Sequence, residues 1–201
     1  MSVTKKAILT VFLVLLVDQT VKFIVKTNMM LGQEIKVFGD WFIIHFTEND
    51  GMAFGWDLPG EFGKLALTLF RIIAVIGIAF YIRYLIRQQA HQGLIICIAL
   101  ILAGAIGNII DSVFYGVIFN DSFYNVATLF PDEPYGTLMH GHVVDMFYVP
   151  IIKTTYPDWF PFVGGNNLVF FRPVFNIADS AISVGVIIIL IFQKRFFHGL
   201  T

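Results

Sequence analysis

Four apolar stretches, each long enough to cross a lipid bilayer, constrain this chain more than any other feature. A membrane-spanning helix needs about 20 mostly apolar residues, because the hydrocarbon core of a bilayer is about 30 Å thick. With 57% hydrophobic and only 13% charged residues, the composition is that of a membrane protein. The sequence predicts a single all-α membrane domain, residues 1–201, with four transmembrane helices. These helices are expected at about residues 7–25, 65–86, 94–115 and 174–192.

Basic residues predict how the four helices are oriented. They precede the first stretch, flank the short connection between the second and third, and follow the fourth. They are Lys5, Lys6, Arg83, Arg87, His91, Lys194, Arg195 and His198. Because cytoplasmic loops are enriched in Lys and Arg, both termini and the short connection are expected in the cytoplasm. The net charge of −1 provides no basic field for nucleic acid, so no nucleic-acid partner is expected.

The other two loops, residues 26–64 and 116–173, are then expected outside the cytoplasm. In the first, two strand-like runs flank Gly39-Asp40, a pair that favours a hairpin turn. They predict a small β-rich cradle on the membrane surface, because open sheet edges cannot lie in the hydrocarbon. The second loop is long and rich in proline and aromatic residues. Its residues 116–139 are expected to be a flap or partner surface that can be shortened without loss of chemistry.

Acidic residues interrupt the apolar stretches at three places. Asp18, Asp111 and Asp179 lie within stretches, and Asp145 lies in the loop before the last one. An ionisable group in a membrane segment is costly and by default marks a functional site that faces the protein interior. From the helical rise, Asp111 lies roughly 25 Å along its helix, Asp179 roughly 9 Å below its outer start, and Asp18 roughly 17 Å from the cytoplasmic side. All four acids can therefore meet in the outer half of the membrane.

Polar partners stand at helical spacing from three of these acids. Lys22 follows Asp18 by four positions, which allows an ion pair. An asparagine precedes Asp111 and Asp179 by three positions, so each pair shares one helix face. The two asparagines are Asn108 and Asn176. Their amides are expected to hydrogen-bond the neighbouring carboxylates and orient them.

A pair of close carboxylates suits peptide hydrolysis. Two such groups cannot both ionise easily, so one keeps its proton at neutral pH. The ionised group can take a proton from water while the other donates to a substrate carbonyl, as in aspartic peptidases. The pair would titrate as a coupled unit.

Each acid also has a purely structural explanation. Asp18 with Lys22 can be an interface pair, and Asp111 can tie its helix to a neighbour. Asp145 can be a solvated loop acid, and Asp179 can favour the positive end of a helix dipole. His140, His142 and Asp145 resemble a metal-site spacing, but a third nitrogen or sulfur ligand is missing, so no metal is expected. Residues alone leave these alternatives open.

Five short motifs follow one another in a recognisable order. They are Val17-Asp18-Gln19-Thr20-Val21-Lys22, Asn49-Asp50-Gly51-Met52-Ala53-Phe54-Gly55, the run from Gly104 to Asp111, Val143-Val144-Asp145-Met146, and Phe175-Asn176-Ile177-Ala178-Asp179-Ser180. In this order and over nearly the whole chain, they resemble the lipoprotein signal peptidases, or signal peptidase II family. The family usually has an arginine directly after the aspartate of the third motif, whereas this chain has Ser112.

The resemblance implies an aspartic endopeptidase with Asp145 and Asp179 as catalytic residues. Substrate-binding or supporting roles are implied for Asp18, Lys22, Asn49, Gly51, Asn108, Asp111 and Asn176. Such an enzyme removes signal peptides from prolipoproteins, before a cysteine that carries a diacylglyceryl lipid, without metal or cofactor. The resemblance also implies sensitivity to globomycin, contact with membrane lipids and a place in the bacterial inner membrane, with the site toward the outer leaflet. We expect a monomer.

Two other functions fit parts of the pattern. A proton- or ion-coupled transporter could use the same acids as a relay. It would need acids along a path to both sides, whereas the cytoplasmic half of the last three stretches is nearly free of them. An inactive scaffold could bind a partner through the outer loops. Cleavage of a lipidated precursor, ion flux, or neither would separate the three.

Overall fold

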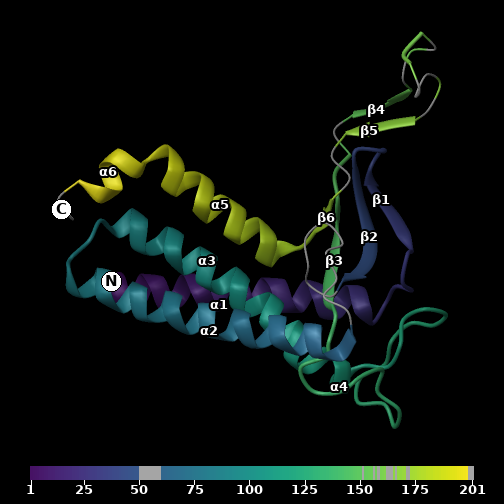
Figure 1. The fold of residues 1–201 in the computed structure, drawn as a ribbon, viewed down its shortest axis with the longest axis horizontal. Helices are drawn as coiled ribbons and strands as arrows, with labels where there is room; N and C mark the ends of the chain where they lie inside the picture. Colours follow the sequence, from purple (N-terminus) through teal and green to yellow (C-terminus); the bar gives the residue numbers. More distant parts are fainter. Residues whose placement is uncertain are drawn as a thin grey trace.

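The chain forms a helical bundle with a small sheet across one end (Figure 1). A computed structural model describes residues 1–49, 60–150, 152–155, 157, 159–161, 165, 167–170 and 173–198. The helices are α1 (Val3–Lys26), α2 (Gly60–Arg87), α3 (Gln92–Ile110), the π-helical turn η2 (Asp111–Tyr115), α4 (Gly116–Ile118), α5 (Ile177–Ile191) and α6 (Gln193–Phe197). Both termini and the α2–α3 connection lie at the end opposite the sheet, as the predicted topology requires.

Three of the described helices are long and apolar enough to cross a membrane. They are α1, residues Phe62–Arg87 of α2, and the continuous helix Gln92–Ile118 that includes α3, η2 and α4. Helix α5 is apolar but has only 15 residues, so the prediction of a fourth span is not confirmed by length. The membrane character of the chain is clear from the three longer helices.

The predicted start of the last helix at residue 174 is wrong. Val174 and Phe175 form strand β6, and α5 begins only after its N-cap residue, Asn176. The Asn176 side chain accepts a hydrogen bond from the Asp179 N–H, and the Asp179 carboxylate accepts one from the Asn176 N–H. This reciprocal capping box satisfies two N–H groups that the first turn leaves unpaired, and it sets the helix start.

The main sheet is antiparallel, with strand order β1-β2-β3-β6. Its strands are β1 (Glu34–Phe38), β2 (Phe42–Asn49), β3 (Val143–Tyr148) and β6 (Val174–Phe175). The predicted hairpin is confirmed: β1 pairs with β2, and Gly39 adopts a positive φ of 54° in the turn. A second sheet, β4 (Ile152–Thr155) with β5 (Asn167–Phe170), extends away from the bundle.

Asp145 lies in strand β3 and not in a loop, which corrects the prediction. β3 is flanked by β2 on one side and by β6 on the other, and its first four residues are buried. Asp145 pairs with Thr47 of β2, and the ladder gives its backbone a fixed position, which a loop would not provide. The strand therefore sets the position of this acid.

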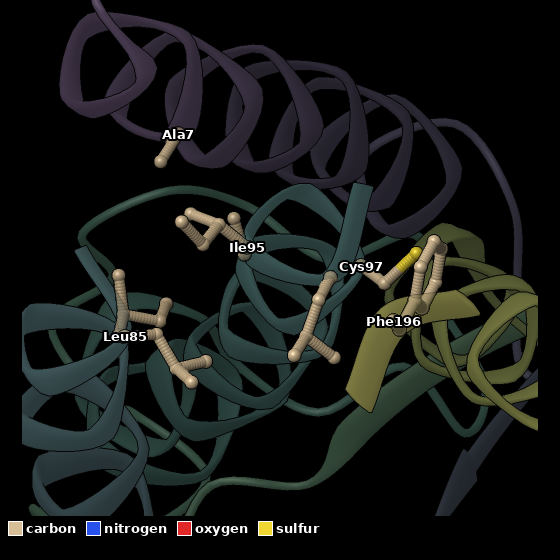
Figure 2. Packing of buried hydrophobic residues seen from close by; sticks show 8 residues of the cluster. Ala7, Leu85, Ile95, Cys97 and Phe196 are labelled. Carbon is tan, nitrogen blue, oxygen red and sulfur yellow. The ribbon is translucent and has the colours of Figure 1, made fainter. Parts of the chain in front are cut away.

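Two apolar clusters hold the helices and the sheet together. One lies toward the chain termini and joins α1, α2, α3 and α6 around residues such as Leu85, Ile95 and Phe196 (Figure 2). The other lies at the sheet end and joins α1, the sheet and the end of the third span through Phe46, Tyr115 and related residues. Between them, α3 and α5 approach closely at Gly104, where a Cβ atom would lie 2.2 Å from the Ala178 carbonyl oxygen. The region between the clusters carries the polar residues.

The segment of residues 119–142 is packed onto the end of the third span, which changes the expectation of a dispensable flap. The N–H groups of Gly136, Met139 and Gly141 donate to the carbonyls of Gly116, Val113 and Ser112. Ser122 and Ala127 within it are buried. Shortening this segment would expose buried groups around Tyr115 and Phe119, so we now expect such a deletion to disturb the fold.

Candidate active site

The structure gathers the predicted site residues that it describes into one hydrogen-bonded cluster near the sheet end of the bundle. Asp18 and Lys22 come from α1, Asn49 from β2, Asn108 from α3, Asp111 from η2, Asp145 from β3, Asn176 from the cap of α5, and Asp179 from its first turn. Gly51 and most of its motif lie outside the described residues. Side chains from six elements thus converge on one place.

Two asparagines lie between the carboxyl groups of Asp145 and Asp179. Asn176 Nδ2 donates to Asp145 Oδ1 at 2.7 Å, and Asn108 Nδ2 donates to Asp179 Oδ1 at 2.8 Å. The amides are also joined, because Asn176 Nδ2 lies 3.1 Å from Asn108 Oδ1. Asn49 Nδ2 donates to the second oxygen of Asp145. Both carboxyl groups are therefore held in a fixed orientation.

The pairing of asparagines with aspartates differs from the sequence expectation. Asn108 was expected to orient Asp111, its neighbour at i+3, but its amide donates to Asp179 on another helix. Asn176 does meet Asp179 through the capping box, yet its amide nitrogen donates to Asp145. Helical spacing predicts which residues share a helix face. The packing of the helices determines which residue of a neighbouring helix that face contacts.

Lys22 lies at the centre of a buried charge network. Its Nζ is 2.9 Å from Asp18 Oδ2 and 2.8 Å from Asp111 Oδ2, so the predicted i,i+4 ion pair is confirmed and has a second acid. The third Nζ donor reaches Asn108 Oδ1 at 2.9 Å, which uses all three lysine hydrogens. Because Lys22 binds the amide oxygen of Asn108, the amide nitrogen of Asn108 is the atom that faces Asp179.

The acids Asp18 and Asp111 are saturated with structural hydrogen bonds. Asp18 Oδ1 accepts from the Ala178 N–H at 2.9 Å, and Asp111 Oδ2 accepts from the Val144 N–H at 3.3 Å. With Lys22 as common partner, the two acids tie α1 and the third span to α5 and β3. Their contacts suit a supporting role and leave little room for a reacting molecule.

Sequence reasoning missed two polar residues that support the site. Gln19 Nε2 donates to Asp18 Oδ2 at 3.1 Å and to Asp111 Oδ1 at 2.9 Å, and its oxygen accepts from the Tyr115 hydroxyl. A second buried lysine, Lys26, pairs with Glu48 of β2. Lys26 continues the i, i+4 series that starts at Asp18 and Lys22, and this spacing was a signal that could have found it.

Lys26 links α1, β2 and the segment of residues 119–142 at the sheet end of the bundle. Besides Glu48, its Nζ donates to Ser122 Oγ at 3.0 Å and lies 4.9 to 5.8 Å from three aromatic ring centres. Glu48 directly precedes Asn49, whose amide reaches Asp145. The pair therefore helps to hold the end of β2 against the site.

Ser112 occupies the position after Asp111 and is buried in the π-helical turn. Its hydroxyl donates to the Asn108 carbonyl at 3.0 Å, and its own carbonyl accepts from the Gly141 N–H. A Cβ atom on Gly141 would lie 2.1 Å from the Asp111 carbonyl oxygen, so the chain passes very close here. Serine fits this close contact because its short side chain is bonded to the Asn108 carbonyl of the same continuous helix.

The π-helical turn itself is notable, because such turns are often found at functional sites.

The two carboxyl groups of Asp145 and Asp179 differ in environment. Asp145 is only 4% exposed, and burial together with the negative charge of Asp179 raises its pKa to about 8. Lys22 and the hydrogen bond from Asn176 act in the opposite direction but do not outweigh burial. With a pKa of about 8, most of Asp145 carries a proton at neutral pH.

Within the described residues, no group of three or more His, Cys, Asp or Glu side chains is arranged to hold a metal ion. His142 Nδ1 lies 3.2 Å from the Lys64 ammonium, and His140 Nδ1 lies 3.0 Å from the Leu138 carbonyl oxygen. These contacts direct both imidazoles toward protein groups.

Comparison with known proteins places this architecture in a family. Residues 10–195 match the sequence profile of the family described as Signal peptidase (SPase) II. A lipoprotein signal peptidase from Porphyromonas gingivalis is 51% identical over 187 residues, covering 92% of this chain and 81% of the relative. That of Amoebophilus asiaticus is 39% identical over 189 residues, covering 91% and 75%.

Solved structures agree with this relationship. Two structures described as bacterial membrane enzymes superpose with TM-scores of 0.62 and 0.61, each at 27% identity. They cover 94% of this chain and 88% and 92% of their own. With a family profile that spans most of the chain and a relative that shares half of its residues, the chain belongs to the signal peptidase II family, the membrane peptidases that remove signal peptides from bacterial prolipoproteins.

Proposed function

We propose that Asp145 and Asp179 are the catalytic pair of an aspartic endopeptidase that cuts prolipoproteins before their diacylglyceryl-modified cysteine. The observation that carries the proposal is the pair of bridged carboxyl groups, one on β3 and one on α5, oriented by Asn176 and Asn108. The raised pKa of Asp145 supports a division of labour, because a protonated and an ionised carboxyl group are needed together. The other two buried acids of the cluster, Asp18 and Asp111, are each bonded to Lys22 and to a backbone N–H.

The reaction follows from these two protonation states. The ionised Asp179 takes a proton from water as the water oxygen attacks the scissile carbonyl carbon. Asp145 donates its proton to the carbonyl oxygen, which forms a neutral tetrahedral intermediate. When the carbon–nitrogen bond breaks, the leaving amine takes the proton held by Asp179, and the intermediate returns its hydroxyl proton to Asp145. Both residues are then ready for another turnover.

The position of the pair suits a lipid-modified substrate. The acids lie toward the sheet end of three apolar spans, and a prolipoprotein presents its scissile bond where its acyl chains and apolar signal segment meet the membrane surface. We place the enzyme in the bacterial inner membrane as a monomer, with both termini in the cytoplasm and the pair toward the outer leaflet. The distribution of basic residues supports this orientation.

A cleavage assay tests the proposed function directly. Purified full-length protein in detergent is mixed with a diacylglyceryl-modified prolipoprotein, and the products are identified by mass spectrometry. We expect a cut on the N-terminal side of the modified cysteine, and no cut in a precursor that lacks the lipid. Ion flux across proteoliposomes without any cleavage would instead favour the transporter.

Cleavage is expected to continue in the presence of strong chelators. The reason is that the proposed chemistry needs only the two carboxyl groups and water. The rate is measured before and after incubation with EDTA, followed by dialysis. Loss of activity that returns when zinc is added would contradict the proposal and make His140, His142 and Asp145 candidate ligands.

Activity is expected to fall as the pH rises through about 8. Asp145 must carry a proton to donate it, and its pKa lies at about 8. The measurement is kcat/KM against pH, with recovery at pH 7 as the control for irreversible unfolding. Because this pKa is raised above the value of 3.8 for a free side chain, the folded state binds more protons between these pH values. The free energy of unfolding should therefore also decrease as the pH rises through this window. Activity that is undiminished well above pH 9 would exclude Asp145 as the proton donor.

A further inference from the structure

A second buried lysine, Lys26, lies at the sheet end of α1. It is the last residue of this helix, one turn beyond Lys22, and its side chain is fully buried. The ammonium lies over the rings of Phe46, Phe119 and Tyr135, with centroids 4.9 to 5.8 Å from Nζ. Aromatic rings attract a cation but do not neutralise it, and a buried charge is costly unless it is paired. The acid that pairs with Lys26 therefore decides what this lysine holds in place.

That acid is Glu48 of β2, and among the described residues it is the only acid within ion-pair distance of Lys26. The side chain of Glu48 is 11% exposed and that of Lys26 is not exposed, so little water reaches the pair. Lys26 Nζ also donates to Ser122 Oγ at 3.0 Å. Because a buried pair is screened only weakly by salt and water, the two charges hold α1, β2 and the segment of residues 119–142 together at one point.

Glu48 and Asn49 are the last two residues of β2, and they reach groups on opposite sides of the strand. Successive side chains of a strand point to opposite faces of the sheet. Glu48 reaches Lys26, and Asn49 reaches the carboxyl group of Asp145. The end of an element frays more easily than its middle. The buried ion pair one residue earlier therefore restrains the position from which Asn49 reaches Asp145.

The carboxyl group of Asp145 is held at both of its oxygens. Asn176 Nδ2 donates to Oδ1 at 2.7 Å and is itself fixed by the capping box of α5. Asn49 Nδ2 donates to Oδ2, and its position depends on the end of β2. If this strand end moved, one carboxyl oxygen would be released and the group could rotate. A proton donor must stay within hydrogen-bond reach of its acceptor, so this rotation would slow the reaction.

We propose that Lys26 and Glu48 are positioning residues that hold Asn49 against Asp145 and so orient the proton donor of the reaction. Through Ser122, the segment of residues 119–142 supports the same arrangement. The inference rests on the proposed function, because it concerns the group that donates the proton. Lys26 and Glu48 act through Asn49, so their loss should affect the chemical step and not substrate capture.

The test is a double-mutant cycle on the full-length enzyme with a lipidated prolipoprotein substrate. Lys26→Met should lower kcat by about ten- to a hundredfold with little change in KM, because a misplaced proton donor slows the chemical step. Asn49→Ala should lower kcat to a similar extent. In the Asn49→Ala background, Lys26→Met should then cost almost nothing more. An unchanged kcat in Lys26→Met, a loss confined to KM, or losses that add in the double variant would overturn the inference.

Lys36→Met is the matched control. It removes a lysine from an ion pair at the edge of the same sheet, but both side chains of that pair are mostly exposed. Its kcat and KM should equal those of the wild type. If thermal unfolding shows that Lys26→Met does not fold, Glu48→Gln takes its place in the cycle, since it keeps the shape of the side chain and removes the charge. Failure of the proposed function looks different, because Asp145→Asn would then still cleave.

Discussion

Asparagine in place of either Asp145 or Asp179 is expected to abolish detectable cleavage while the protein stays folded. The substitution keeps the shape of the side chain but removes the group that donates or accepts the proton. General acid–base catalysis contributes about 10²- to 10⁴-fold to a rate, and neither residue can take over the role of its partner. Rates are measured with the lipidated precursor, and folding is followed by thermal unfolding in detergent.

The matched control for this pair is Asp132→Asn. Asp132 is an exposed acid in the segment of residues 119–142, and its substitution removes the same charge without touching the cluster. It should cleave at the wild-type rate. If Asp145→Asn or Asp179→Asn kept full activity, that residue would have to be removed from the catalytic pair. If a well-folded Asp111→Asn protein were inactive, the pair itself would have been assigned to the wrong acids.

Replacing Lys22 by methionine is expected to have the largest effect on stability. Lys22 is fully buried between Asp18 and Asp111, so methionine would leave two buried carboxylates without their cation. Breaking a buried ion pair by removing one partner typically lowers the free energy of unfolding by about 3–5 kcal/mol. Thermal and denaturant unfolding in detergent would measure the loss.

A surface pair provides the control for Lys22. Lys36 and Asp40 are also an ion pair four positions apart, but both side chains are mostly exposed. Lys36→Met should therefore change stability very little, because water and salt screen an exposed pair. Adding Asp111→Asn to Lys22→Met should recover part of the loss by removing one uncompensated charge. A Lys22→Met protein as stable as the wild type would show that the network does not hold the bundle together.

Asp18→Asn and Asp111→Asn should also reduce stability or yield more than they reduce the chemical step. Each acid accepts a backbone N–H from another element, at Ala178 and at Val144 respectively. An asparagine can accept one of these bonds but cannot balance the lysine charge. This contrast with the proposed catalytic pair, Asp145 and Asp179, would separate residues that hold the site from residues that react.

Much of the site could be predicted from the sequence because its signals are local. The Asp18–Lys22 ion pair needs only helical spacing, and the β1–β2 hairpin needs only a turn sequence between two strand-like runs. The intramembrane acids were visible because a charge in an apolar stretch is rare. Each of these features depends on residues within a few positions of one another.

The tertiary structure decided which partners these residues meet. Asn108 shares a helix face with Asp111 yet donates to Asp179, because α3 and α5 approach closely at Gly104 and Ala178. Asp145 is a strand residue because the start of β3 pairs with β2, where Asp145 lies opposite Thr47.

The sequence by itself determined the membrane character of this chain, its family motifs and the acids that could serve as a catalytic pair. Only the tertiary structure decided how the pair is bridged and where α5 begins. The physical reason is that periodicity along a chain reports the side of an element on which a residue lies. The hydrogen-bond partner across the bundle depends on how closely the backbones of different elements approach.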